Sequence, residues 1–152
     1  MTQAVRAMQA GGPEVLEFAE VETPRPGPGE VLVDVEAAGV NFIDTYRRSG
    51  VYPMDYPHVV GVEGTGRIAE VGEGVESYRV GDWVAWHEGP GSYATQVVVA
   101  TDNLLAVPEG VSAEVAAAMP LQGLTAQYLV TTSHAIKPGD TALVHAGAGG
   151  VG

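Results

Sequence analysis

The sequence has 152 residues, the size of one ordinary domain with room for part of a second. It carries 19 acidic against 7 basic residues, a formal net charge of −12 that repels nucleic acid and anionic membrane surfaces. It has no cysteine, which excludes disulfides, thiolate catalysis and any zinc site built on thiolates.

Two explanations of the acidity stay open. The carboxylates form an ordinary solvated face, or they are an adaptation to high salt, where dense carboxylates and scarce lysine keep a surface hydrated. Lys137 is the only lysine. The apolar runs are too short to cross a bilayer, and the first ten residues lack the basic-then-apolar pattern of a secretory signal. The sequence therefore predicts a cytoplasmic protein.

The first two thirds of the chain predict short antiparallel strands. Its 21 glycines and 10 prolines are scattered, as expected for turns between strands. Short strands at this spacing are typical of a small antiparallel barrel. The predicted strands cover residues 3–9, 15–21, 30–40, 65–71, 83–86, 92–99 and 104–107.

One short helix is predicted inside this β region, over residues 41–49. Asn41 stands at the N-cap position, Asp44 lies in the first turn, and Gly50 ends the helix. A helical link follows the strands. Ser112 caps a helix that runs to about residue 119, and a second helix opens at residue 120 and continues to about residue 132.

The last twelve residues predict a strand followed by a glycine-rich turn. Residues 141–145 are apolar and lead directly into Gly147, Gly149, Gly150 and Gly152. Such glycines let the backbone approach a pyrophosphate, which the amides of a following helix then bind. The pattern predicts the start of a Rossmann unit whose helix and ribose-reading residue would lie beyond residue 152.

Four polar or aromatic residues stand close together in the sequence: Asn41, Asp44, Tyr46 and Tyr52. Helix capping explains the first two, and half-buried aromatics explain the tyrosines. Alternatively, amide and phenol groups converge on a carbonyl-bearing ligand, which suits a hydride acceptor because that chemistry needs orientation more than a nucleophile. Spacing alone favours the first explanation. Glu63, set among glycines, is expected to be a hydrogen-bonded structural carboxylate.

Several segments together resemble one family. They are similar to the zeta-crystallin type of quinone oxidoreductase, in the medium-chain dehydrogenase/reductase superfamily. The resemblance covers the whole chain and has its landmarks in residues 38–46, 48–53, 61–66, 80–84, 122–126 and 139–152.

The resemblance implies a GroES-like barrel followed by a Rossmann α/β domain, a fold that is mainly β with α. It places the substrate-side domain at residues 1–120, a helical link at 121–140, and the first strand and turn of the dinucleotide-binding domain at 141–152. It also implies chemistry without zinc, because the superfamily's zinc enzymes place a cysteine ligand where Asn41 stands and a histidine ligand where Val62 stands.

The resemblance further implies the site residues. Asn41, Tyr46 and Tyr52 are expected to orient or polarise the acceptor. The residues expected around the cofactor, NADPH, are Asn41, Asp44, Thr125, Ala146, Gly149, Gly150 and Gly152.

The implied activity is hydride transfer from NADPH to a quinone or a conjugated carbonyl, in a full-length homodimer. One alternative is an enoyl-thioester or enone reductase of the same superfamily. Another is a non-enzymatic crystallin-like structural protein or binding module. Because the resemblance reaches only into the start of the Rossmann domain, residues 1–152 alone are expected to fold the barrel but to fail as a reductase.

Overall fold

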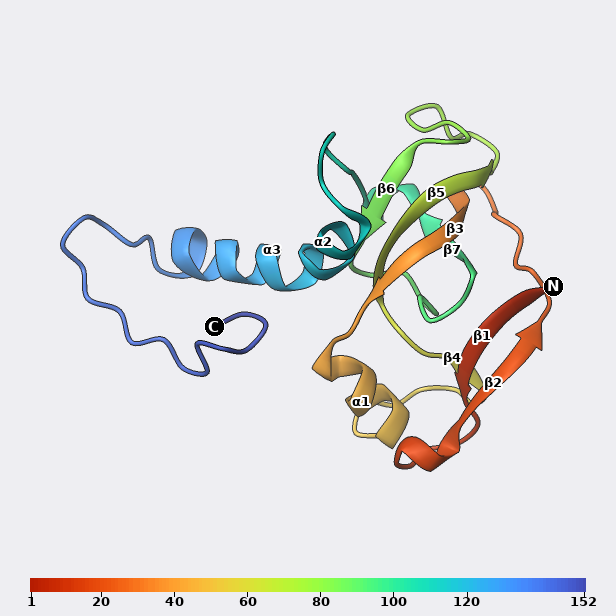
Figure 1. Ribbon diagram of the computed structural model, residues 1–152, viewed down its shortest axis with the longest axis horizontal. Coiled ribbons are helices and arrows are strands. Elements are labelled where there is room, and N and C mark those ends of the chain that lie inside the picture. Colours follow the sequence, from red (N-terminus) through yellow and green to blue (C-terminus); the bar gives the residue numbers. More distant parts are fainter.

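A computed structural model describes residues 1–152 and shows a strand-rich body from which one helix and a long terminal segment project (Figure 1). The larger of its two sheets is antiparallel, with five strands in the order β7-β3-β5-β6-β8. These strands are β3 (Glu30–Gly39), β5 (Glu63–Val71), β6 (Trp83–Trp86), β7 (Gln96–Ala100) and β8 (Leu104–Ala106).

A second antiparallel sheet has the order β2-β1-β4. Its strands are β1 (Thr2–Ala7), β2 (Leu16–Val21) and β4 (His58–Val59), and two 3-10 turns, Pro13–Val15 and Thr101–Asn103, lie between strands. In Figure 1 this sheet lies below the larger one, next to α1 (Phe42–Ser49).

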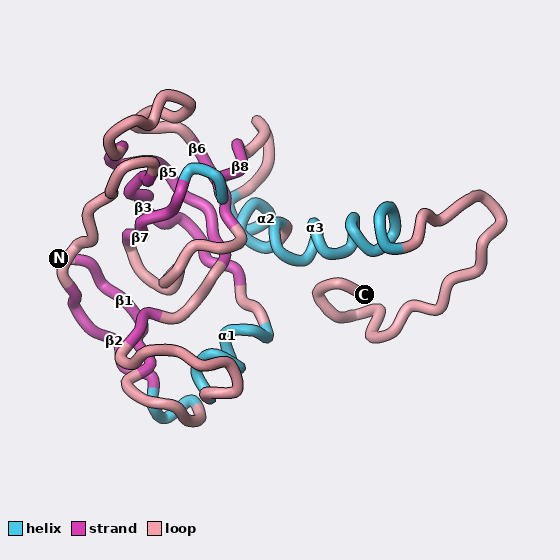
Figure 2. Tube along the Cα trace, turned by 180° about the vertical axis from the view of Figure 1, so that it is seen from behind, coloured by secondary structure: helices cyan, strands magenta, loops and turns pink.

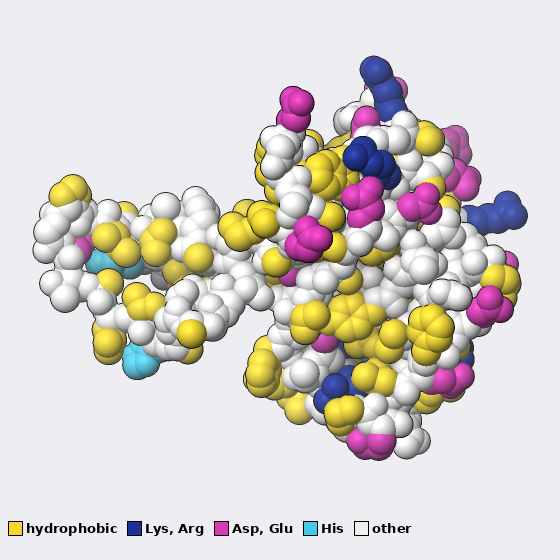
Figure 3. Space-filling model, in the orientation of Figure 1, with side chains coloured by type: hydrophobic (Ala, Val, Ile, Leu, Met, Phe, Trp, Pro, Cys, Tyr) yellow, Lys and Arg dark blue, Asp and Glu magenta, His cyan; other side chains and the backbone are white.

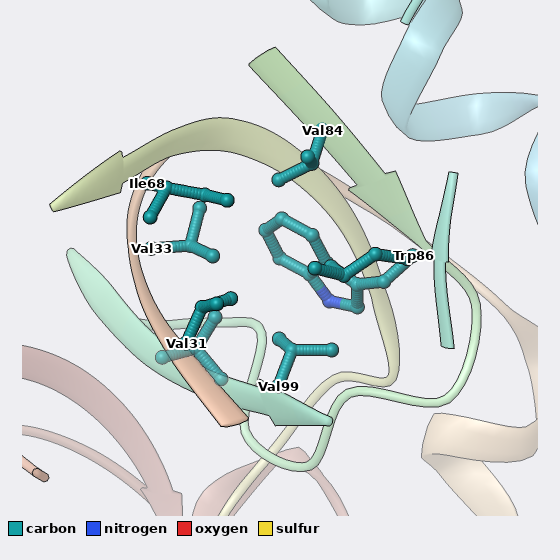
Figure 4. Packing of buried hydrophobic residues seen from close by; sticks show 8 residues of the cluster. Val31, Val33, Ile68, Val84, Trp86 and Val99 are labelled. Atoms are coloured by element: carbon teal, nitrogen blue, oxygen red, sulfur yellow. The ribbon is translucent and has the colours of Figure 1, made fainter. Parts of the chain in front are cut away.

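The core forms where alternating side chains of the larger sheet point inward. Val31 and Val33 on β3 face Val84 and Trp86 on β6, as period-two alternation requires (Figure 4). Trp86 and these three valines are fully buried. The complete cluster is Val31, Val33, Ile68, Val84, Trp86, Val97, Val99 and Leu104.

The fold class predicted from the sequence is confirmed, but neither sheet closes into a barrel. The predicted strand over residues 92–99 forms only from Gln96 onward. Residues 93–95 instead join the two sheets: the Val5 N–H donates to the Tyr93 carbonyl at 2.8 Å, and the Thr95 carbonyl accepts from the Val35 N–H at 3.0 Å. The segment makes one isolated bridge, Ala4 with Ala94, and no continuous ladder with either sheet.

The two helices predicted after the strands form, with α2 (Ala113–Ala118) capped by Ser112, whose Oγ accepts from the Val115 N–H. It continues as α3 (Pro120–Tyr128) and one π-helical turn, Leu129–Ser133. Figure 2 shows α2 beside the strand-rich body and α3 leading away from it.

The predicted strand over residues 141–145 is wrong for this chain. These residues are exposed and form no ladder, and Leu143 is 83% exposed. A parallel-type strand needs neighbours on both sides to satisfy its backbone and bury its side chains, and no other segment of residues 1–152 pairs with it. The segment turns back toward α3, as Figures 1 and 2 both show.

No helix of the structure has both the length and the apolar character that crossing a membrane requires.

Acidic side chains are spread over the strand-rich body on the face seen in Figure 3. Two ion pairs are present, Arg6 with Glu17 at 3.7 Å and Arg67 with Glu36 at 3.3 Å, so most of the 19 carboxylates lack a cationic partner. Mutual repulsion of unpaired charges disfavours the compact state.

We therefore expect the melting temperature to rise with salt. Screening is nearly complete at about 1 M, where the Debye length is roughly 3 Å. A rise that continues into multimolar salt would indicate hydration of the acidic surface, whereas a melting temperature that stays flat above moderate salt would mark the acidity as ordinary. Thermal melts in increasing potassium chloride measure this.

Candidate active site

The start of α1 places a polar cluster directly after β3. Asp44, the third residue of α1, accepts a hydrogen bond from the Asn41 backbone N–H at 3.0 Å through Oδ2. The same oxygen accepts from the Tyr93 hydroxyl at 2.9 Å. The capping role predicted for Asp44 is thus confirmed, and it fixes the backbone of Asn41 at the helix entrance.

The side chain of Asn41 is held between two other elements. It is 6% exposed. Its Nδ2 donates to Glu63 Oε2 on β5 at 2.7 Å, and its Oδ1 accepts from Gln122 Nε2 on α3 at 3.2 Å. One amide therefore connects the larger sheet with the helical link.

Glu63 is a fully buried carboxylate, as expected from the glycines around it. Besides Asn41, it accepts from the Leu121 N–H at 2.5 Å, near the N-terminus of α3. Free N–H groups and the helix dipole at this end favour a negative charge. Gly39 pairs with Glu63 across β3 and β5, and a Cβ at position 39 would collide with the carboxylate.

Beside Asn41 lies a cleft of about 470 Å³ between α1, α3 and the terminal segment. Its polar groups come from Asn41, Gln122 and Thr125, and Thr125 bonds back to the Leu121 carbonyl at 2.7 Å. The lining residues are Val40, Asn41, Phe42, Ile43, Leu121, Gln122, Thr125, Gly150 and Val151. A concave, mostly apolar surface with a few convergent polar groups is typical of a small-molecule site.

Another cavity, of about 450 Å³, lies between β8 and the helices α2 and α3. It is lined almost wholly by apolar side chains, so it offers nothing to orient a polar reactant.

The two tyrosines predicted for the site lie beside the cleft and do not line it. Tyr46 and Tyr52 pack against each other with ring centroids 5.5 Å apart, and Phe42 contacts Tyr46 edge-on at 5.4 Å. Phe42 itself lines the cleft, and from it the row of rings continues to Tyr46 on α1 and to Tyr52 just after α1. Tyr46 is 38% and Tyr52 48% exposed, which leaves both rings accessible.

Only part of the glycine-rich turn lines the cleft. Gly150 lines it, and a Cβ at this position would overlap the Gln122 amide. Ala146 has a positive φ of 51°, and its carbonyl accepts from the Gly149 N–H at 2.6 Å. Ala146, Gly149 and Gly152 form this turn outside the lining residues.

Sequence reasoning gave no role to Gln122 or Tyr93. Gln122 and Thr125 are three residues apart on α3, so both lie on one face of the helix. This spacing is the signal that could have linked Gln122 to the predicted residue Thr125. Tyr93 lies 49 residues from Asp44, and no periodicity connects them. No group of three or more His, Cys, Asp or Glu side chains is arranged to hold a metal ion.

Tyr93 is the group whose ionisation the fold disturbs most. Burial raises the pKa of its phenol well above the ordinary value of 10.0, and the hydrogen bond to Asp44 and the negative charges of Asp44 and Glu63 raise it further. The folded protein therefore retains this proton at a pH where the unfolded chain loses it.

A pH dependence of stability follows from this shift. Because the folded pKa is raised, the contribution of Tyr93 is fully present below about pH 10 and is lost as pH rises toward the folded pKa. We expect the free energy of unfolding to fall more steeply above pH 10 in the wild type than in Tyr93→Phe. Urea denaturation from pH 8 to 11 measures it, with Tyr128→Phe as the control at an exposed position. Parallel pH profiles for all three proteins would contradict the shift.

Comparison with known proteins agrees with this architecture. Residues 27–138 match the family model of the alcohol dehydrogenase GroES-like domain. A quinone oxidoreductase of Pseudomonas aeruginosa is 46% identical over all of this chain and 47% of its own length. A 2-haloacrylate reductase of a Burkholderia species is 39% identical over all of this chain and 48% of its own length. The chain thus spans about half the length of the curated relatives it matches.

Solved structures give the same result. A mycobacterial protein in complex with NADPH superposes with a TM-score of 0.95 at 46% identity, over 99% of this chain and 46% of its own. A quinone oxidoreductase of Pseudomonas syringae pv. tomato superposes with a TM-score of 0.96 at 46% identity, over 99% of this chain and 47% of its own. The chain therefore belongs to the alcohol dehydrogenase GroES-like domain family.

Proposed function

We propose that this chain forms the substrate side of an NADPH-dependent quinone reductase. The observation that carries the proposal is the cleft in which Asn41, Gln122 and Thr125 converge beside the backbone of Gly150. Amides and a hydroxyl orient a reactant without offering a strong acid or a nucleophile, which is what hydride transfer requires. In this proposal residues 1–120 form the substrate-side domain, 121–140 the link, and 141–152 the start of the cofactor domain.

The residues of the cleft fit a nicotinamide cofactor. A Cβ at Gly150 would overlap the Gln122 amide, so only glycine lets the turn lie this close to the polar end of the cleft. Glycines in such a turn also allow the backbone to approach a pyrophosphate. When bound, NADPH supplies the hydride. Asn41, Gln122 and Thr125 would hold the nicotinamide end, and Gly149, Gly150 and Gly152 with Ala146 would form the backbone turn toward the pyrophosphate.

The acceptor is proposed to lie against the aromatic wall. Tyr46 and Tyr52 keep accessible ring surface beside Phe42, and a planar quinone stacks on such rings. Their hydroxyls donate hydrogen bonds to the carbonyl oxygen that gains negative charge as hydride arrives. Hydride transfer to a quinone gives the hydroquinone monoanion, which would take the one proton it still needs from water. Asp44 contributes indirectly, by fixing the backbone at Asn41.

We further propose that no metal takes part, since Asn41 and Val62 occupy the positions that the resemblance assigns to two zinc ligands.

Steady-state kinetics of the full-length protein, meaning the product of the complete gene that carries these residues, test this function. We expect NADPH oxidation to depend on quinone and to survive dialysis against a chelator. No NADPH binding and no turnover would favour a structural or binding protein of the same fold.

A second activity has a specific observation in its favour. The Burkholderia relative is named for reduction of 2-haloacrylate, an activated C=C bond. The same cleft admits an enone, because a conjugated carbonyl is polarised at the same oxygen. Competition between a quinone and an α,β-unsaturated acid or thioester in one assay separates the two, and the substrate with the larger kcat/KM is the one the site fits.

A further inference from the structure

We propose that Glu63 is a positioning residue that fixes the orientation of the Asn41 amide and so decides which atom Asn41 presents to the cofactor. This inference rests on the proposed function of the cleft. Glu63 does not line the cleft, whereas Asn41 and Gln122 do.

The orientation follows from the chemistry of the partners. An ionised carboxylate only accepts hydrogen bonds, so the amide group that faces Glu63 must be the nitrogen. The Nδ2···Oε2 distance of 2.7 Å is that of a charge-assisted bond. The Asn41 oxygen is thereby turned toward α3, where Gln122 Nε2 donates to it at 3.2 Å.

The carboxylate cannot easily move away from this position. Its other oxygen accepts from the Leu121 N–H at the start of α3. On the opposite side, the space it fills exists only because residue 39 is glycine, and the backbone carbonyl of Ala117 on α2 closes the same space. Glu63 therefore connects β3, α1 and α3 through one fully buried group.

A consequence for recognition is that Asn41 offers an acceptor oxygen. The group that it binds in the cleft should be a hydrogen-bond donor, such as the N–H of a carboxamide or a hydroxyl of the cofactor. Polarisation of the acceptor carbonyl is then left to donors such as the tyrosine hydroxyls. Glu63 should accordingly affect the KM for NADPH more than the KM for quinone.

Glu63→Gln in the full-length protein tests the proposal. The new NH2 group replaces one of the two acceptor oxygens. The Leu121 N–H is backbone and keeps the remaining oxygen, so the NH2 group faces Asn41. Asn41 must then turn its oxygen toward residue 63 and its nitrogen toward the cleft. We expect NADPH affinity, measured by nicotinamide fluorescence, to fall about tenfold or more, since one mismatched buried hydrogen bond costs about 1–3 kcal/mol. The KM for quinone should change much less. Glu36→Gln, an exposed carboxylate on β3, is the control and should leave NADPH affinity unchanged.

A reciprocal variant distinguishes orientation from simple structural support. In Glu63→Gln with Asn41→Asp, the new Gln N–H donates to the new carboxylate, which again presents an oxygen toward Gln122. We expect NADPH affinity to return to within about threefold of the wild type, as for a restored hydrogen-bond pair. This variant also decides the question if the single substitution does not fold.

Wild-type affinity in Glu63→Gln, or no recovery in the double variant, would overturn the positioning role. Absence of NADPH binding by the wild type would instead overturn the proposed function itself.

Discussion

Trp86→Ala is expected to lower the free energy of unfolding of residues 1–152 by about 3–5 kcal/mol, the usual cost of truncating a large buried aromatic side chain. The ring is fully buried at the centre of the core (Figure 4). Gly64 and Gly89 lie so close to it that neither position has room for a Cβ, and its Nε1 donates to Ser92 Oγ at 2.8 Å. The cavity is therefore bounded by backbone, which relaxes little.

Trp83→Ala is the matched control on the same strand. Trp83 is an odd number of residues from Trp86, so it points to the other face, where it is partly exposed and packs under the Arg67 guanidinium at 5.3 Å. Trp83→Ala should lower the free energy of unfolding clearly less, by about 1–2 kcal/mol, the ordinary range for a partly exposed site. Urea denaturation followed by circular dichroism measures both variants. An equal decrease in the free energy of unfolding for both variants would show that the core is not centred on Trp86.

Gly39→Ala is expected to destabilise the protein by about 3 kcal/mol or more, combining overpacking with the loss of buried hydrogen bonds. The added methyl would overlap both the Glu63 carboxylate and the Ala117 carbonyl oxygen. One neighbour is held by Asn41 and Leu121, and the other is helix backbone, so α2 has to move away from the sheet. Turnover of the full-length protein should fall as well, because the Asn41 amide moves with its partner.

Gly123→Ala is the control for this substitution. Gly123 lies inside α3, and the only close neighbour of an added Cβ is the flexible end of Met119 at 3.2 Å. Alanine in a helix interior is favoured over glycine by about 0.5–1 kcal/mol. We expect unchanged or higher stability. A Gly39→Ala variant as stable as Gly123→Ala would contradict the tight enclosure of Glu63.

The sequence predicted the strands of the larger sheet well, because their β-branched core residues recur at every second position, as Val31 and Val33 do on β3 and Val97 and Val99 on β7. It predicted α1 and α2 from local capping chemistry at Asp44 and Ser112. Alternation and capping depend on residues that are close together in the sequence, so a single sequence is enough to predict them.

Features that depend on distant partners were not predictable in the same way. The segment around Tyr93 has strand-like residues, yet it joins two sheets because Val5 and Val35 happen to meet there. The apolar residues 141–145 have strand composition but no neighbours with which to pair.

The same distinction applies to the candidate site: some of its residues were predictable, but the contacts between distant residues were not. Asn41, Thr125 and Gly150 were predicted through the family resemblance, and the structure brings them to one cleft. The bond from Leu121 to Glu63 joins residues 58 positions apart, and nothing in their local sequences indicates it. Gln122 lies within one of the segments that carry the resemblance, but its contact with Asn41 depends on where α2, packed on the sheet, places the start of α3.

The central claim is that the cleft beside Asn41 holds the nicotinamide of the cofactor. A crystal structure of the full-length protein with bound NADPH tests it most directly. We predict the nicotinamide ring in van der Waals contact with Thr125, its carboxamide N–H within about 3.2 Å of the Asn41 oxygen as a hydrogen bond requires, and the C4 face open toward Tyr46 and Tyr52. A nicotinamide bound elsewhere, with Asn41 and Gln122 still bonded only to each other and to Glu63, would contradict the account.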